Sequence, residues 1–102
     1  MDKLSRLRAL CAADPKNAFA WYTLAMEEKK TDRARSLETF ARVHREHPSY
    51  VPNYYHYAKT LEESGREEDA RAIYAEGMKV AIAAGDQKTH DELAGALDLL
   101  AG

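Results

Sequence analysis

Residues 51–82 read VPNYYHYAKTLEESGREEDARAIYAEGMKVAI, and residues 18–48 read AFAWYTLAMEEKKTDRARSLETFARVHREHP. Aligning the two stretches places similar residue types at matching positions: Trp21 with Tyr54, Ala25 with Ala58, and Phe40 with Tyr74. The offset is 33 residues in the first half of each stretch and 34 in the second. A fixed period of this length is typical of repeat architectures, so we expect two copies of one structural unit.

Apolar residues recur at helical spacing through both copies and beyond them on either side. No stretch alternates apolar and polar residues with β-branched enrichment, as a half-buried strand would. The sequence therefore predicts an all-α fold with about six helical segments, at residues 3–13, 17–30, 33–47, 51–64, 67–84 and 87–101.

Proline, glycine and short polar residues predict where these helices begin and end. Pro15 and Pro48 disfavour helical geometry in the residues before them, so helices should end there. Ser49 is expected to cap the next helix, and Ser64 and Glu67 have the spacing of a capping box. Gly85-Asp86 is expected to end one helix and cap the following one.

The aligned residues resemble the tetratricopeptide repeat (TPR) family, whose pattern is aromatic-x2-Leu-small-x2-Tyr, then Ala-x3-aromatic, then Pro. The first copy supplies Trp21, Leu24, Ala25, Ser36, Phe40 and Pro48, and the second supplies Tyr54, Tyr57, Ala58, Leu61, Ala70, Tyr74 and Gly77. The resemblance implies a short right-handed α-solenoid of antiparallel helix pairs. Small residues such as Ala58 and Gly77 would let paired helices approach closely. Three positions depart from the pattern: Glu28 replaces a large apolar residue, Val43 replaces a small residue, and Ile82 replaces the final proline.

The resemblance extends to both ends of the sequence. Leu7 and Leu10 match the second-helix positions Phe40 and Val43, and His90, Leu93, Ala94 and Leu97 match the first-helix positions. We therefore expect residues 1–102 to form a single TPR-like domain. Its parts would be an opening half-repeat at 3–14, repeats at 17–48 and 51–83, and a closing helix at 87–101.

Charge and composition exclude several classes of function. Fifteen Lys and Arg residues against seventeen Asp and Glu residues give a net charge of −2, so nothing favours nucleic acid or an anionic membrane as partner. No run of 18 apolar residues occurs, which argues against a membrane span. The first residues are charged and lack the apolar core of a secretory signal, so we expect a cytoplasmic location.

The resemblance also implies where a partner would bind. TPR arrays bind partners mainly on a concave groove formed by the first helix of each unit. The matching positions are Phe19, Tyr22, Met26 and Lys29 in the first copy, Tyr55, His56, Lys59 and Glu62 in the second, and Lys88 in the closing helix. An alternative is that Phe19 and Tyr22 pack against the opening helix.

One TPR subtype grips a C-terminal carboxylate with a Lys/Asn/Asn/Lys/Arg set. The corresponding residues here are Tyr22, Met26, His56, Lys88 and Glu92. Only Lys88 fits, so a clamp of that kind is not expected.

Other groups give little support for catalysis or metal binding. His44 and His47 are three residues apart on one helix but lack a third fixed ligand, so helix-end histidines are the favoured interpretation. Cys11 is expected in the core. The charged runs 27–30 and 67–69 are interpreted as solvated faces. We predict no enzymatic activity, no cofactor and no metal.

The sequence therefore predicts a protein-interaction module, an adaptor or scaffold that binds a peptide or helix of a partner protein in its groove. One alternative is a structural TPR protein that self-associates into a homo-oligomer, for which exposed leucines on the first or last helix would be the sign. A second alternative is an enzyme or a metal-binding protein.

Overall fold

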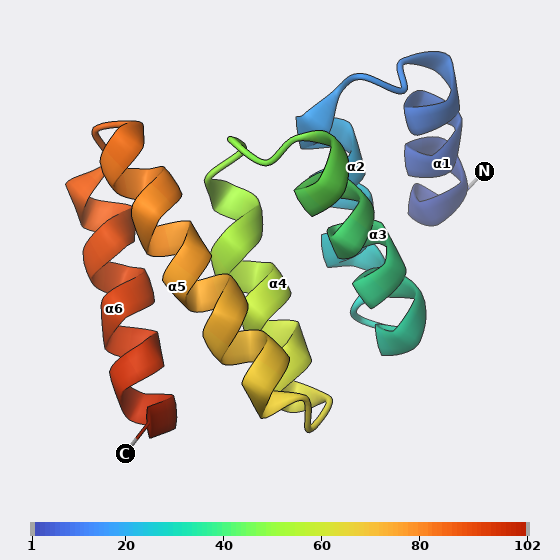
Figure 1. Ribbon diagram of the computed structural model, residues 1–102. Coiled ribbons are helices and arrows are strands. Elements are labelled where there is room, and N and C mark those ends of the chain that lie inside the picture. Colours follow the sequence, from blue (N-terminus) through green and yellow to red (C-terminus); the bar gives the residue numbers. More distant parts are fainter. Residues whose placement is uncertain (1, 102) are drawn as a thin grey trace. The chain divides into compact units, whose positions relative to one another are not determined.

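The computed structural model describes residues 2–101, and their helices confirm the predicted all-α fold. Each helix lies within a few residues of its predicted segment (Figure 1). The six helices are α1 (Lys3–Ala13), α2 (Ala18–Glu28), α3 (Arg33–Glu46), α4 (Pro52–Glu63), α5 (Glu67–Ala83) and α6 (Gln87–Ala101). They form two compact units: α1 to α3 belong to unit 1, which ends at His47, and α4 to α6 belong to unit 2, which begins at Pro48. The organisation of residues 1–102 as one domain stays a prediction.

Short polar side chains cap four of the helices. The side chains of Asp2, Asn17, Asp32 and Asp86 accept hydrogen bonds from backbone N–H groups three residues later, at 2.8 to 3.1 Å. Each satisfies a donor that the first helical turn leaves unpaired. The predicted cap at Asp86, after Gly85 in the left-handed conformation (φ 73°), is confirmed.

Two predicted caps are wrong. Helix α4 begins after Val51, with Pro52 in its first turn and no side-chain cap, so Ser49 lies outside the helix start. Helix α5 begins after Arg66, because Gly65 makes the turn in the left-handed conformation (φ 77°). Ser64 instead ends α4, and its hydroxyl donates to the Thr60 carbonyl at 2.8 Å.

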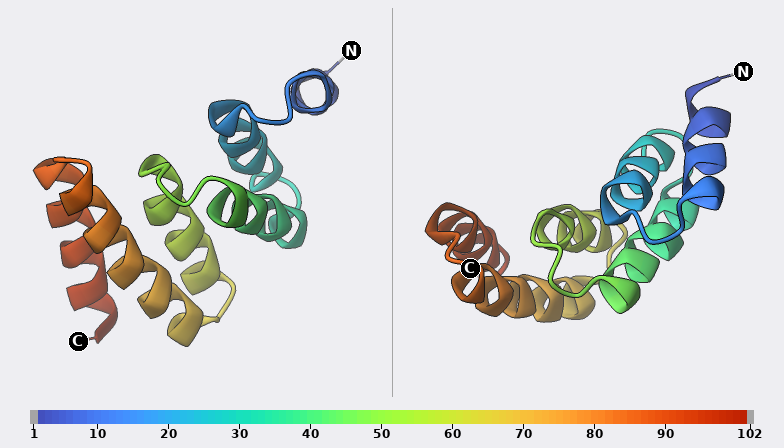
Figure 2. Two further views of the ribbon diagram at one scale, coloured as in Figure 1. Left: turned by 45° about the horizontal axis from the view of Figure 1, so that its top comes forward. Right: turned by 90° about the horizontal axis from the view of Figure 1, so that it is seen from above.

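In unit 1, α2 packs against both α1 and α3 (Figure 2). Cys11, Ala20 and Leu24 form a buried cluster, against which Leu4, Leu7 and Trp21 are packed. The Trp21 indole N–H donates to the Pro15 carbonyl at 2.8 Å, and the Arg42 guanidinium lies 4.0 Å from the centre of the Trp21 ring. The indole therefore links α2 both to the preceding turn and to α3.

The interpretation of the charged run 27–30 as a solvated face is wrong for Glu28. Its side chain is 1% exposed, although Glu carboxylates are rarely buried without partners. Thr39 Oγ1 of α3 donates to Glu28 Oε1 at 2.5 Å. The other oxygen, Oε2, lies 3.6 Å from Arg8 of α1 and 3.7 Å from Arg35 of α3. One carboxylate therefore contacts both helices that flank α2.

In unit 2, α5 packs against α4 on one side and α6 on the other (Figure 2). Tyr54 and Tyr74 are completely buried. The Tyr54 hydroxyl donates to the Pro48 carbonyl at 2.6 Å and lies 3.1 Å from Glu76 Oε2. The Tyr74 hydroxyl donates to Glu62 Oε2 at 2.6 Å. Both phenol groups thus keep hydrogen-bond partners inside the core, as buried polar groups require.

These two tyrosines predict a loss of stability at alkaline pH. Burial, and secondarily the Glu76 and Glu62 carboxylates, raise the pKa of Tyr54 and Tyr74 well above the ordinary value of 10. Above pH 10 the unfolded chain releases phenolic protons that the folded chain retains, so stability falls as pH rises. We expect a loss of about 1.4 kcal/mol for each tyrosine between pH 8 and pH 11.

Urea unfolding at the two pH values, compared between the unmodified chain and the Tyr54→Phe/Tyr74→Phe variant, measures this contribution. The variant should lose less stability between pH 8 and pH 11, because neither phenylalanine titrates. An equal loss in both chains would show that other groups cause the alkaline destabilisation.

Candidate partner-binding surfaces

The predicted site residues of unit 1 lie along one face of α2, with Lys29 directly after its last residue. Phe19, Tyr22, Met26 and Lys29 follow one another at intervals of three and four residues, which places them in one stripe along the helix. Phe19 is 63% exposed, so α1 does not bury it, and the other three side chains are half-buried. The α2 face therefore presents two aromatic rings, a thioether and an ammonium group.

The predicted site residues of unit 2 include four on α4: Tyr55, His56, Lys59 and Glu62, all half-buried. The Tyr55 ring meets the His56 ring edge to face at 5.4 Å, and the ring of core residue Tyr74 at 6.3 Å. Such aromatic pairs favour a defined ring orientation. Tyr55 thus packs against the core residue Tyr74, and its side chain is still partly exposed to solvent.

Glu62 has a second role that the sequence pattern did not indicate. Its carboxylate accepts the hydrogen bond from buried Tyr74, so one of its oxygens is engaged inside unit 2. This contact limits what Glu62 can offer to a partner. Lys59, one helical turn earlier, is the cationic group of the α4 face.

Lys88 belongs to a different helix, as the second residue of α6, and is exposed. The structure therefore brings together Tyr55, His56, Lys59 and Glu62 on α4, and separately the four residues on α2. The α2 face belongs to unit 1, and the α4 face belongs to unit 2.

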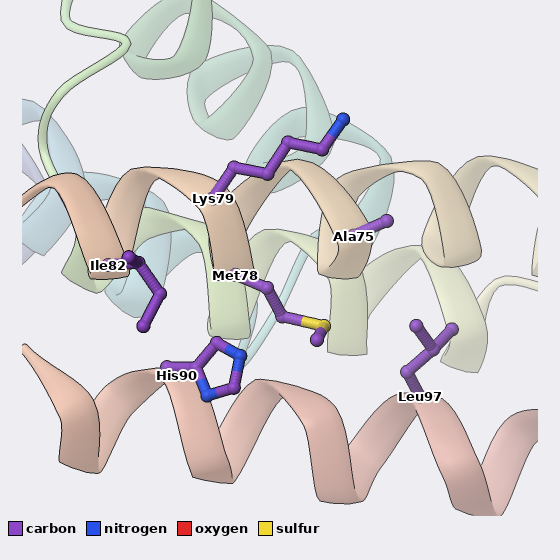
Figure 3. Close-up of a pocket in the computed structure, with 6 residues that line it drawn as sticks. All are labelled: Ala75, Met78, Lys79, Ile82, His90 and Leu97. Carbon is purple, nitrogen blue, oxygen red and sulfur yellow. The ribbon is translucent and has the colours of Figure 1, made fainter.

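An open apolar pocket of about 500 Å³ lies between α5 and α6, and the sequence did not predict it. Figure 3 shows Met78 and Ile82 of α5 directed toward α6, with His90 and Leu97 of α6 opposite them. Ala75 and Lys79 complete the lining. Ile82 is 52% exposed, although it occupies the position where the repeat pattern has a proline. That departure from the pattern was the available signal.

The groups considered for chemistry are not gathered into a site. Within residues 2–101, no three His, Cys, Asp or Glu side chains lie close enough together to hold a metal ion. Cys11 is buried as expected, and burial raises the pKa of its thiol, which keeps it in the less reactive protonated form. Among the described helices, none is long and apolar enough to cross a membrane.

Comparisons with known proteins show similarity to solved structures. No family model and no curated protein matches the sequence. The solution structure of a tetratricopeptide repeat domain protein from Salinibacter ruber is 39% identical, with a TM-score of 0.81 over 85% of this chain and 89% of that one. A crystal structure of a tetratricopeptide repeat domain protein from the same organism is 37% identical, with a TM-score of 0.80 over 84% of this chain and 98% of that one. A protein from Bordetella parapertussis is 25% identical, with a TM-score of 0.83 over 99% and 89% of the two chains.

Proposed function

Because the chain belongs to the tetratricopeptide repeat family, whose fold is that of a protein-interaction module in general, we propose that the exposed faces of α2 and α4 bind a peptide or helix of a partner protein. The observation that carries this proposal is the register of the two faces. Tyr55 of α4 follows Tyr22 of α2 by 33 residues, the repeat period, and both rings are partly exposed. An aromatic side chain thus recurs at a half-buried position of the repeat.

The composition of the two faces supports a partner that combines apolar and acidic side chains. Phe19, Tyr22, Met26 and Tyr55 supply apolar and aromatic surface of the kind that anchors peptides. Lys29 and Lys59 carry positive charge, and the acidic Glu62 already accepts a hydrogen bond from Tyr74. We therefore propose an adaptor or scaffold that acts by binding and not by catalysis.

The test is to compare binding by the unmodified chain with binding by the Tyr22→Ala/Tyr55→Ala variant. Partner proteins would be captured with the unmodified chain and shortened to the peptides that still bind. The affinity of each peptide for the two chains would then be measured by titration calorimetry. Each truncated aromatic anchor costs about 1–2 kcal/mol, so affinity should fall about 10- to 100-fold in the double variant. Affinity should also fall with rising salt, because the lysines attract acidic residues through solvent.

A Leu99→Ala variant is the matched control, because Leu99 is 86% exposed and lies on α6, which contributes no residue to the α2 or α4 face. It removes exposed apolar surface without touching Tyr22 or Tyr55, so binding should be unchanged. Circular dichroism verifies that each variant is folded. Equal affinity of the double variant and the unmodified chain would exclude the α2 and α4 faces as the binding site.

A further inference from the structure

Helix α6 exposes the residues that its counterpart α4 buries. His90, Ala94 and Leu97 of α6 align with Tyr54, Ala58 and Leu61 of α4 at a constant offset of 36 residues. In α4 these three positions are at most 1% exposed, and α5 packs against that helix. In α6 all three are half-buried and the first and last line the pocket of Figure 3. The pocket thus lies where a helix of the α5 type would pack.

Helix α1 is the matching helix in unit 1. Its Leu7 and Leu10 align with Phe40 and Val43 of α3 at an offset of 33 residues. Val43 is completely buried in unit 1, where α3 packs against α2, whereas Leu10 is 47% exposed. Leu7 packs against the buried cluster of its own unit, so Leu10 is the residue that α1 exposes on the face with which a second helix of a repeat contacts its first helix.

The helices α1 and α6 also carry opposite net charges. Helix α1 has three basic residues and no acidic one between Lys3 and Ala13. Helix α6 has three acidic residues, Asp91, Glu92 and Asp98, against one lysine. Opposite charge favours the encounter of the two helices and disfavours pairing of either helix with itself.

We propose that α1 of one copy of this chain docks into the α5–α6 pocket of a second copy, so that α6 and the second copy's α1 complete a helix pair across two chains. The occupant of the pocket is a second copy because α1 exposes an apolar residue in the register of a repeat's second helix and its net charge is opposite to that of α6. Each copy contributes one α1 and one pocket, so the contact is head-to-tail and can propagate into rings or open chains. These surfaces differ from the proposed partner-binding faces of α2 and α4.

The register also identifies a charge pair. Arg6 aligns with Thr39, which donates to Glu28, and Leu7 aligns with Tyr74, which donates to Glu62. Glu28 and Glu62 correspond in α6 to Leu97 and Asp98. In this register Leu7 of the docked helix faces Asp98 of the receiving copy. Of the two arginines that flank Leu7, Arg8 contacts Glu28 of its own chain, so Arg6 is the one that we pair with Asp98.

The experiment measures the mass of the 102-residue chain by sedimentation velocity over a range of concentrations. Leu10→Glu places a charge on α1, and Ile82→Glu places one in the pocket. Both side chains are about half exposed, so the variants should fold, which circular dichroism verifies. Each variant alone should associate at least tenfold more weakly than the unmodified chain.

An equimolar mixture of the two variants distinguishes a head-to-tail contact from a symmetric one. Leu10→Glu keeps its pocket and Ile82→Glu keeps its α1, so the mixture should form heterodimers that grow no further. Leu99→Glu, at an exposed position outside the pocket lining, is the control and should associate like the unmodified chain. A mixture that stays monomeric, or an unmodified chain that is monomeric up to about 1 mM, overturns the proposal.

Charge reversal provides a second measurement. Arg6→Glu and Asp98→Arg should each weaken association, and the chain carrying both substitutions should regain it, because the pair is restored with opposite polarity. A double variant that associates no better than either single variant overturns the placement of Arg6 beside Asp98.

Discussion

Substitution of Gly77 by valine is expected to lower the free energy of unfolding by about 3 kcal/mol, because overfilling a packed core displaces side chains and backbone. Gly77 lies in α5 where that helix contacts α4 and α6. A Cβ atom at this position would lie 2.7 Å from the Tyr54 Cβ and 3.0 Å from Leu93 Cδ1. The Tyr54 Cβ cannot swing away as the end of a flexible side chain could, so the helices themselves must separate.

Gly77→Ala decides between two opposing effects. Alanine in a helix interior is favoured over glycine by about 1 kcal/mol, but the Cβ contact with Tyr54 opposes this gain. We expect the contact to dominate, with a net loss of about 1–2 kcal/mol.

Gly95→Ala is the matched control for Gly77. Gly95 lies inside α6, and nothing lies within 4 Å of a Cβ added there. The same substitution should therefore stabilise the chain by up to about 1 kcal/mol. Urea denaturation of both variants measures the two signs. A stabilised Gly77→Ala variant would contradict the close approach of α4 and α5.

Gly77 also illustrates why the fold could be predicted from the sequence. The apolar spacing and the 33- to 34-residue period are visible along the sequence, without knowledge of which distant residues meet. They predicted all six helices among the described residues. The small residue at position 77 was expected to permit close helix packing, and the distances to Tyr54 confirm it. The pattern repeats because each copy packs its first helix against its second helix through residues of similar size at matching positions.

Features that depend on residues far apart in the sequence could not be predicted in this way. Burial of Glu28 requires Arg8, Thr39 and Arg35, which come from two other helices and belong to no repeat pattern. The α5–α6 pocket likewise depends on how side chains of two different helices pack against each other. The wrong caps at Ser49 and Ser64 arose because competing turn geometries, at Pro52 and Gly65, shifted the helix starts by two residues each.

Glu28→Ala is the second substitution with a large expected effect, a loss of about 2–3 kcal/mol in the free energy of unfolding. It removes the hydrogen bond from Thr39 and leaves a cavity between three helices. Arg8 and Arg35 are about half exposed, so they regain water when the carboxylate is lost. The loss is therefore smaller than for an ion pair buried on both sides.

Two further variants separate the contribution of charge from that of volume. Glu28→Gln keeps the volume and an oxygen that can accept from Thr39, so it should cost only about 1 kcal/mol, the value of a partly solvated ion pair. Glu28→Leu introduces the residue found at the equivalent position 61 of α4. Well-packed apolar replacements of buried ion pairs are often neutral, and Thr39 keeps a carbonyl acceptor, Arg35 O at 3.3 Å. The leucine variant should thus remain within about 1 kcal/mol of the unmodified chain.

Thermal and urea unfolding of the three variants should give the stability order Leu, Gln, Ala, from most to least stable, because the side chain at position 28 serves mainly to fill the space between α1, α2 and α3. A leucine variant as unstable as the alanine variant would show instead that the two arginine contacts hold these helices together.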